Sequence, residues 1–293
     1  LSNSVADSIQ TIQLPNGLTL LMQQMPWLES AAMSLLVPAG SQRDPEGLAG
    51  LAGFTAEMVQ RGCGQYNSRQ FVEQLDRLGA ARSASVTNYH TRFSAAVPTN
   101  RLRETLALYR ELVLAPLLPA SQLEDSRMVA MQELLALEDD LAQKLIKVLR
   151  KRLYPDPYGR STTGTMESVQ AIQLENIQNH VKNFYVPDQA ILSIAGKIDF
   201  NEVQNMVDEL FGSWQGTVQQ ELTEHPPAEG HHHIEHDSNQ TQIGIVFPSV
   251  PYSHPDYFLA RSAIGVLSDG MSSRLFTEVR EKRGLCYMVY AMC

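Results

Sequence analysis

Cysteine is scarce in this chain of 293 residues. It has three cysteines, Cys63, Cys286 and Cys293, and no two of them form a Cys-x-x-Cys pair. An odd number of cysteines cannot all pair within one chain, and small domains that depend on disulfides carry a much higher proportion of them. The scarcity therefore indicates that disulfides do not hold this fold together.

Long apolar runs and an excess of positive charge are also lacking. The longest apolar run, 31–40, has about half of the ~20 residues that a membrane-spanning helix needs, so it predicts a buried strand. Lys and Arg total 23 against 32 Asp and Glu, a net charge of −9, and nucleic acids bind basic surfaces. We expect neither a membrane span nor a nucleic-acid partner. No leader pattern precedes the first strand, and the sequence does not decide between bacterial cytoplasm and periplasm.

What the chain does have is a regular succession of short strands and helices. Strand patterns over 9–14 and 18–23 flank the turn signal Asn16-Gly17, and a third strand is expected at 30–37. An apolar content of 43% suffices for a buried core. Further along, the spacing predicts helices over 48–58, 100–114, 122–153, 166–185 and 200–214, a hairpin over 80–97, and a strand over 190–195.

The strand pattern of the first part of the chain restarts near its end. Met33-Ser-Leu-Leu-Val-Pro38 aligns without gaps on Ile243-Gly-Ile-Val-Phe-Pro248, an offset of 210 residues, and Pro45 falls on Pro255 at the same offset. A fixed offset with the same order of strand, loop and helix is the signature of an internal repeat. We therefore predict a strand at 242–247.

The repeat predicts an α+β fold of two homologous domains, each a mostly antiparallel sheet packed with helices. The first domain is expected over 1–215 and a linker of polar residues and proline over 216–230. The second domain is expected to start at 231 and to be truncated at 293.

Several segments of the chain resemble one family. They are Leu14-Pro-Asn-Gly-Leu-Thr-Leu20, Pro38-Ala-Gly-Ser-Gln-Arg-Asp44, Gly47-Leu-Ala-Gly-Leu-Ala-Gly53-Phe54, Tyr185-Val-Pro-Asp188 and Ser273-Arg-Leu-Phe276. In this order they resemble the pitrilysin and mitochondrial processing peptidase family of inverted-zincin metallopeptidases, and the resemblance covers nearly the whole chain. It implies repeated α+β domains, which agrees with the 210-residue offset.

The resemblance also implies a zinc motif, H-x-x-E-H on a helix, with a further Glu about 76 residues later. Two imidazoles four residues apart share a helix face and bind Zn²⁺ together with the distant Glu, while the intervening Glu acts as base on the metal-bound water. Here the aligned motif positions hold Gly53, Ala56 and Glu57, the distant ligand aligns with Glu133, and a supporting carboxylate aligns with Ser126. The motif itself is lost.

Glu57 and Glu133 are the only carboxylates left at the aligned ligand positions. Glycine and alanine supply no ligand atom, and two carboxylates without an imidazole make a poor zinc site. We therefore expect no metal or other cofactor in this chain, and zinc only in a catalytic partner. Glu57 and Glu133 are then carboxylates on helix surfaces. The alternatives are a weak site for a hard cation and a role in shaping the vacated pocket.

A second sequence of the form H-x-x-E-H occurs at His232-His-Ile-Glu-His236. Its neighbours predict an extended segment, in which His232 and His236 lie ~13 Å apart, whereas each zinc ligand lies about 2 Å from the metal. We interpret it as a solvated, histidine-rich strand start that binds metal ions only adventitiously.

The resemblance is most specific around Arg280 and Tyr287. These two residues match the family's Arg and Tyr of the second domain, which bind substrate near the scissile bond. The guanidinium supplies several donors to peptide carbonyls, and the phenol hydroxyl can donate to a developing oxyanion. Both are expected to bind substrate.

The resemblance thus implies a non-catalytic subunit of a two-subunit zinc peptidase. Its partner would be a catalytic subunit with an intact H-x-x-E-H, and Arg280 and Tyr287 would contribute to the partner's active site on a peptide substrate. Two alternatives stay open: an independently active zinc metalloendopeptidase with unusual ligands, and a purely structural member of the family. The sequence names neither the partner nor the peptide.

Overall fold

The computed structural model describes residues 9–218, 222–226 and 230–293. The chain divides into two compact units, residues 1–244 and Ile245–Cys293. Part of the expected linker over 216–230 lies outside the described residues. Residues 231–244 group with the first unit, and the domain boundary inferred from the repeat stays a prediction.

The first unit contains a six-stranded sheet in the order β1-β2-β8-β3-β7-β6. Only the β2–β8 pair is parallel among the pairings of the described strands. The mostly antiparallel character matches the prediction for the first domain. The strands are β1 Gln10–Gln13, β2 Thr19–Gln24, β3 Ser30–Val37, β6 Ala81–Val86, β7 Thr91–Pro98 and β8 Ile191–Gly196, and a separate two-stranded ribbon is made of β4 Gly62–Cys63 and β5 Tyr66–Asn67.

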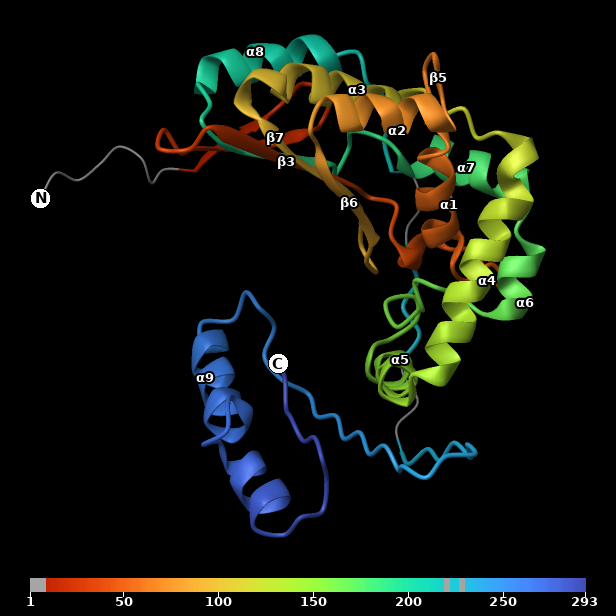
Figure 1. The fold of residues 1–293 in the computed structure, drawn as a ribbon, viewed down its shortest axis with the longest axis vertical. Helices are drawn as coiled ribbons and strands as arrows, with labels where there is room; N and C mark the ends of the chain where they lie inside the picture. The colour runs from red at the N-terminus through yellow and green to blue at the C-terminus, as the bar shows by residue number, and fades with distance from the viewer. Residues whose placement is uncertain (1–8, 219–221, 227–229) are drawn as a thin grey trace, which may run out of the picture. The chain divides into compact units, whose positions relative to one another are not determined.

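The strands form where apolar and small residues alternate. In β3 the side chains of Ala31, Met33, Leu35 and Val37 are buried while their neighbours are exposed or half-buried, so one face of the strand packs into the core. The apolar run over 31–40 is therefore a buried strand, as predicted. Helices α2, α3 and α8 cover this buried face of the sheet (Figure 1).

Most helices begin and end close to the predicted positions. Asn67 caps α2 through a bond from the Gln70 backbone N–H to its side chain, and the Gln70 side chain returns a bond to the Asn67 backbone N–H. The helices are α1 Leu51–Val59, α2 Ser68–Arg77, α3 Leu102–Leu114, α4 Leu123–Asp139, α5 Leu141–Leu153, α6 Met166–Ala171, α7 Leu174–Phe184, α8 Phe200–Phe211 and α9 Tyr257–Ser268.

Two predicted long helices are each split into two. The stretch 122–153 breaks between α4 and α5 because the Asp140 carboxylate accepts the backbone N–H groups of Ala142 and Gln143 and caps a new helix. The stretch 166–185 breaks between α6 and α7, where Gln173 exchanges capping bonds with Asn176. Capping side chains inside a helical pattern stop one helix and start the next.

The second unit consists of α9 and a π-helical turn, η5 Phe276–Glu281. The strand predicted at 242–247 is wrong, since none of these residues lies in a strand or pairs with a described strand. A strand is stable only with a hydrogen-bonded neighbour, and the side chains of Ile243 and Phe247 are 79% and 75% exposed. None of the described helices has both the length and the apolar character of a membrane span.

Candidate functional site

Helix α1 carries positions 53, 56 and 57, which the resemblance aligns with the family's zinc motif. Its N-terminal end is bound by the buried Asp44, whose carboxylate oxygens accept the backbone N–H groups of Gly50 and Ala52 at 2.8 Å each. Burial raises the pKa of Asp44 to about 7, against the lowering effect of these N–H donors and of the Arg160 guanidinium. Asp44 thereby holds the start of α1 in place.

Gly53, at the first motif position, lies directly against the backbone of a neighbouring loop. A Cβ added to Gly53 would lie 2.7 Å from the carbonyl oxygen of Thr162, closer than carbon and oxygen atoms pack. One turn earlier, a Cβ on Gly50 would lie 2.9 Å from the Thr163 carbonyl oxygen. An imidazole at position 53 therefore fits only if this loop moves.

The loop over 155–164 is held against α1 by polar contacts from several elements. The Arg160 guanidinium binds both carboxylate oxygens of Asp156, at 2.8 and 2.6 Å, and donates to the Asp44 carbonyl. The Asn88 amide, in the turn between β6 and β7, donates to the carbonyls of Tyr158 at 2.6 Å and Arg160 at 3.0 Å. These bonds join the loop to both the sheet and the segment that caps α1.

The far end of the same loop is bound from α5, and the segment before α1 is bound from α6. Lys147 on α5 donates from Nζ to the Gly164 carbonyl at 2.7 Å, and burial lowers the pKa of this lysine. Ser168 on α6 donates from its hydroxyl to the Ala49 carbonyl at 2.7 Å. The loop over 155–164 is thus fixed by hydrogen bonds in the space next to Gly53.

Neither of the other two positions of the lost motif presents a free ligand. Ala56 is buried at 4% exposure. The Glu57 carboxylate forms an ion pair with Arg61 one turn later on the same helix, with Nη2 and Oε1 2.6 Å apart. This contact is the ordinary i,i+4 pair of a helix surface, as expected for Glu57.

Glu133 and Ser126 lie on α4, which packs against α1. The Glu133 side chain is on the exposed side of α4, whereas Ser126 is fully buried and its hydroxyl has no partner among the described residues. The described residues contain no group of three or more His, Cys, Asp or Glu side chains that could hold a metal ion, with or without Glu57 and Glu133.

This donor set does not fit zinc. Zinc sites in proteins use imidazole nitrogen or thiolate sulfur, usually with three or more protein ligands. At the aligned positions there is one exposed carboxylate, one carboxylate engaged by Arg61, and a glycine whose neighbouring space is filled by the Thr162 carbonyl. We therefore assign no chemistry to a metal in this chain.

Arg280 and Tyr287 lie together in the second unit. The guanidinium carbon of Arg280 lies 5.2 Å from the centroid of the Tyr287 ring and 4.6 Å from that of Phe276, both within the range of a cation–π contact. Tyr287 is 84% exposed, so its hydroxyl is open to solvent or to a ligand.

The local backbone explains why these two residues meet. The backbone N–H of Gly284 donates to the Arg280 carbonyl, and that of Leu285 donates to the Val279 carbonyl, which turns the chain back after η5. Gly284 has a φ of 60°, in the left-handed region that glycine adopts without a steric penalty. The pair predicted from the sequence is therefore assembled by a short local turn.

The histidine-rich segment around His232 and His236 is exposed and contains no helix, as predicted, but the strand expected to start there does not form among the described residues. The Nδ1 atom of His232 lies 3.1 Å from a guanidinium nitrogen of Arg152. The two histidines do not share a helix face, which is what an H-x-x-E-H zinc motif requires.

Strand β6 is the first strand of the hairpin predicted over 80–97, but its position at the edge of the sheet was not predicted. It lies at the edge of the sheet, pairs with β7 and with no other described strand, and packs beside α1. Its side chains from Ala81 to Ser85 are all exposed, and its outer edge pairs with no described strand. The signal in the sequence was the run Ala-Arg-Ser-Ala-Ser, which has strand-like alternation without a large apolar residue.

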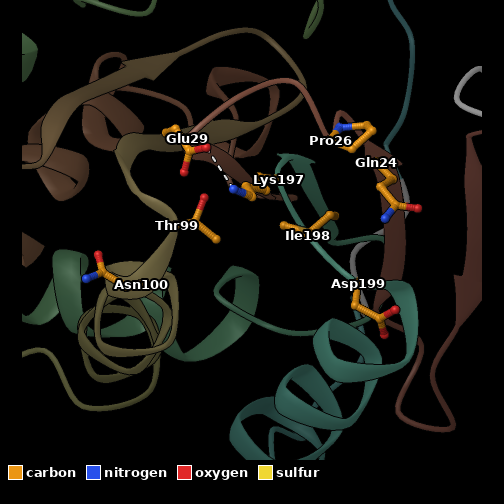
Figure 2. A pocket seen from close by; sticks show the side chains of 8 residues that line it. All are labelled: Gln24, Pro26, Glu29, Thr99, Asn100, Lys197, Ile198 and Asp199. Atoms are coloured by element: carbon orange, nitrogen blue, oxygen red, sulfur yellow. Dashed lines mark hydrogen bonds and ion pairs between the residues drawn. The ribbon is translucent and has the colours of Figure 1, made fainter.

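A surface hollow lies at the end of the sheet where β2 and β8 finish, and Figure 2 shows the side chains around it. Lys197 and Glu29 form an ion pair of 2.7 Å there, and the Asp199 carboxylate caps α8. None of the predicted site residues lines it. The lining residues are Gln24, Pro26, Glu29, Thr99, Asn100, Lys197, Ile198 and Asp199.

Comparison with known families decides the membership of this chain. The family described as insulinase, peptidase family M16, matches residues 19–166, and the one described as the peptidase M16 inactive domain matches residues 171–292. The chain belongs to peptidase family M16. The resemblance to pitrilysin-type enzymes and the expected M16-type α+β fold are thereby confirmed.

Curated M16 relatives are described as uncharacterized zinc proteases. The chain is 26% identical to one from Rickettsia bellii over 97% of this chain and 69% of the relative, and 29% identical to one from Mycobacterium leprae over 95% and 64%. A Bacillus subtilis relative, YmxG, is 24% identical over 94% and 68%. The chain therefore spans about two thirds of the length of these relatives.

Solved M16 structures share the fold. A structure described as a peptidase M16 inactive domain from Pseudomonas fluorescens has a TM-score of 0.82 at 23% identity and covers 97% of this chain and 70% of that one. A protease from Helicobacter pylori has a TM-score of 0.81 at 19% identity with the same coverage. Pitrilysin has a TM-score of 0.67 at 22% identity, over 76% of this chain and 24% of pitrilysin.

Proposed function

We propose that this M16 chain is the non-catalytic subunit of a two-subunit zinc peptidase. In this role it binds a peptide substrate and contributes Arg280 and Tyr287 to the active site of a catalytic M16 subunit that carries an intact H-x-x-E-H. The zinc of the assembly would be held by that partner. The peptide bond would be cleaved there and not on α1 of this chain.

The observation that carries the proposal is the contrast between two parts of the family's machinery. At the metal positions the chain has Gly53 and Ala56, and the Thr162 carbonyl fills the space where a side chain at position 53 would begin. In the second unit Arg280 and Tyr287 are both present and in contact. Loss restricted to the metal positions favours a subunit that still handles substrate over a chain that has lost every function.

Strand β6 supplies a second reason to propose peptide binding. An unpaired strand edge presents a row of backbone N–H and C=O groups that an extended peptide can pair with, as a further strand of the sheet. Strand β6 pairs with no described strand other than β7, and its exposed side chains are small apart from Arg82. A peptide bound there would lie beside α1.

The chemistry of the pair suits a supporting role. The Arg280 guanidinium can donate to peptide carbonyls, and the Tyr287 hydroxyl can donate to an oxyanion that develops on a scissile carbonyl. The cation–π contact between them holds the guanidinium over the ring and leaves the exposed hydroxyl free for this donation. Neither residue needs a metal in its own chain for this task.

The test is to mix purified chain with a catalytic M16 subunit and to follow cleavage of a fluorogenic peptide. Arg280→Ala and Tyr287→Phe should each lower the rate of the mixture by about tenfold or more, because each removes a donor to the reacting peptide. Arg283→Ala is the matched control, since Arg283 is an exposed arginine of the same turn, and it should leave the rate unchanged. Equal rates for wild type and Arg280→Ala would contradict the proposal.

An independently active zinc metalloendopeptidase is the main alternative, and the names of the curated relatives are the observation that favours it. Metal analysis of protein without a histidine tag distinguishes the two. One zinc per chain, lost on replacing Glu57 or Glu133, would support the alternative. A purely structural role would be supported by the absence of binding to any peptide, with and without a partner.

A further inference from the structure

The sheet has a second face, opposite the helices α2, α3 and α8, which we name the open face. Its side chains are exposed or half-buried, whereas those of the opposite face are mostly buried. Residues paired across antiparallel strands point to the same face, so the strand registers define its members. Serine is frequent among them. The residues of interest are Ser34, Ser83, Ser85, Arg92, Ser94 and Ser193.

Arg92 on β7 is held in a defined position on the open face. Its Nε atom donates to the hydroxyls of Ser34 at 3.0 Å and Ser94 at 2.8 Å, and these two hydroxyls are themselves 3.2 Å apart. The serines belong to the neighbouring strands β3 and β7 and face each other across the sheet. Because Nε is bound, the guanidinium plane is oriented by the sheet itself.

The terminal nitrogens of this guanidinium have no acceptor among the described residues. No carboxylate forms an ion pair with Arg92 in that part of the chain, and Arg92 is the only charged side chain that the described strands of the sheet place on the open face. The chain as a whole has a net charge of −9, so this cation is not part of a general basic surface. An isolated, oriented and unpaired arginine fork is suited to one carboxylate.

We propose that Arg92, oriented by Ser34 and Ser94, binds the acidic side chain of a bound peptide and makes this subunit select acidic peptides. The proposal rests on the proposed peptide-binding function and adds the substrate class. Ser83 and Ser85 lie on the same face between Arg92 and the β6 edge, and Ser85 stands directly opposite Arg92. On this face β6 carries only Ala81, Ser83 and Ser85, so an acidic side chain that reaches from a peptide at that edge across β6 meets no large side chain of the strand.

The experiment uses the full chain and two fluorescein-labelled peptides with amidated C-termini. The peptides are identical except that one carries glutamate where the other carries glutamine. Fluorescence anisotropy should show about fivefold tighter binding of the glutamate peptide at low salt, an advantage that decreases as salt rises. Arg92→Gln should abolish the advantage, so that the two peptides bind with equal affinity.

Two further variants separate positioning from charge. Arg92→Lys keeps the charge but loses the planar fork and should retain only part of the preference. Ser94→Ala removes one of the two acceptors that orient Nε and should reduce the preference while the chain melts as the wild type does. Arg69→Gln is the control for loss of an exposed positive charge, because Arg69 lies on α2 and pairs with Glu73. It should leave the preference intact.

The possible outcomes are distinct. Equal binding of the two peptides by the wild type, or a preference that survives Arg92→Gln, overturns the role of Arg92 and leaves peptide binding standing. A preference that appears only for peptides with a free C-terminal carboxylate also overturns it, in favour of a chain-end site. Failure to bind either peptide, alone and with a catalytic subunit, removes the proposed function and this inference together.

Discussion

The two regions that the family resemblance links to chemistry are built in opposite ways. The metal positions on α1 lie inside a packed structure, where Asp44 binds the helix start and the loop over 155–164 presses the Thr162 carbonyl against Gly53. The pair of Arg280 and Tyr287 is exposed and is held by one local turn and a cation–π contact. The first region is packed against neighbouring backbone, whereas the second is exposed and accessible to a ligand.

This difference teaches that the positions on α1 that align with the family's zinc motif not only lack ligand atoms but are also closely packed. Restoring the side chains would require the surrounding loop to move, because Arg160, Asn88 and Lys147 bind that loop to the rest of the unit. The exposed pair needs no such rearrangement to meet a substrate. Stability measurements can test how tightly the region around Gly53 on α1 is packed.

The largest effect is expected from rebuilding the motif as Gly53→His, Ala56→Glu and Glu57→His together. The imidazole at position 53 collides with backbone, so the triple variant should be less stable than the Ala56→Glu/Glu57→His double variant by about 3 kcal/mol, at the upper end of overpacking costs. Urea unfolding measures the difference. A triple variant as stable as the double one, with one zinc per chain, would show that the loop yields easily and that the region is still a metal site.

A smaller effect concerns the pH dependence of Asp44. Its pKa rises from the ordinary 3.8 to about 7 in the folded chain, so the folded state binds more protons than the unfolded state between these values. The contribution of Asp44 to stability is therefore largest below about pH 4 and decreases as the pH rises to about 7. Asp44→Asn removes this contribution.

The measurement for Asp44 is the difference in unfolding free energy between wild type and Asp44→Asn from pH 4 to pH 8. Burial lowers the pKa of His180 to about 4, which makes stability rise with pH over part of this range, but both proteins contain His180 and its effect cancels in the difference. The advantage of wild type should decrease with pH. An advantage that grows with pH would mean that the backbone donors of Gly50 and Ala52 outweigh burial.

The smallest effect is expected at Glu133. Its side chain is exposed on α4, so Glu133→Gln should change the free energy of unfolding by less than about 0.5 kcal/mol and leave the activity of a mixture with a catalytic subunit unchanged. Arg280→Ala measured in the same mixture is the positive control. A marked loss of activity or of bound metal in Glu133→Gln would instead show that Glu133 is a metal ligand.

The fold of the first unit followed closely from local patterns. The alternation in β3 and the capping of α2 by Asn67 depend on neighbours within a few residues, and both were predictable. The breaks at Asp140 and Gln173 were missed because a capping residue inside a long helical pattern competes with the helix by only about 1 kcal/mol. The strand expected at 242–247 was wrong because pairing depends on a distant partner.

The candidate site shows the same division. The absence of a ligand atom at positions 53 and 56 could be read from the sequence directly, since neither glycine nor alanine has a donor atom in its side chain. The approach of Thr162 to Gly53 could not, because it joins positions more than one hundred residues apart in the chain. The edge position of β6 and the bonds that orient Arg92 likewise could not be predicted without the strand order.

By itself, the sequence determined which atoms are available: no nitrogen ligand at positions 53, 56 and 57, and an arginine and a tyrosine seven residues apart near the end of the chain. The tertiary structure alone decided which of these places are open. A backbone carbonyl closes the first because close packing brings distant segments within contact distance, while exposure leaves the second accessible. Side-chain chemistry is local to a residue, whereas accessibility depends on everything that packs around it.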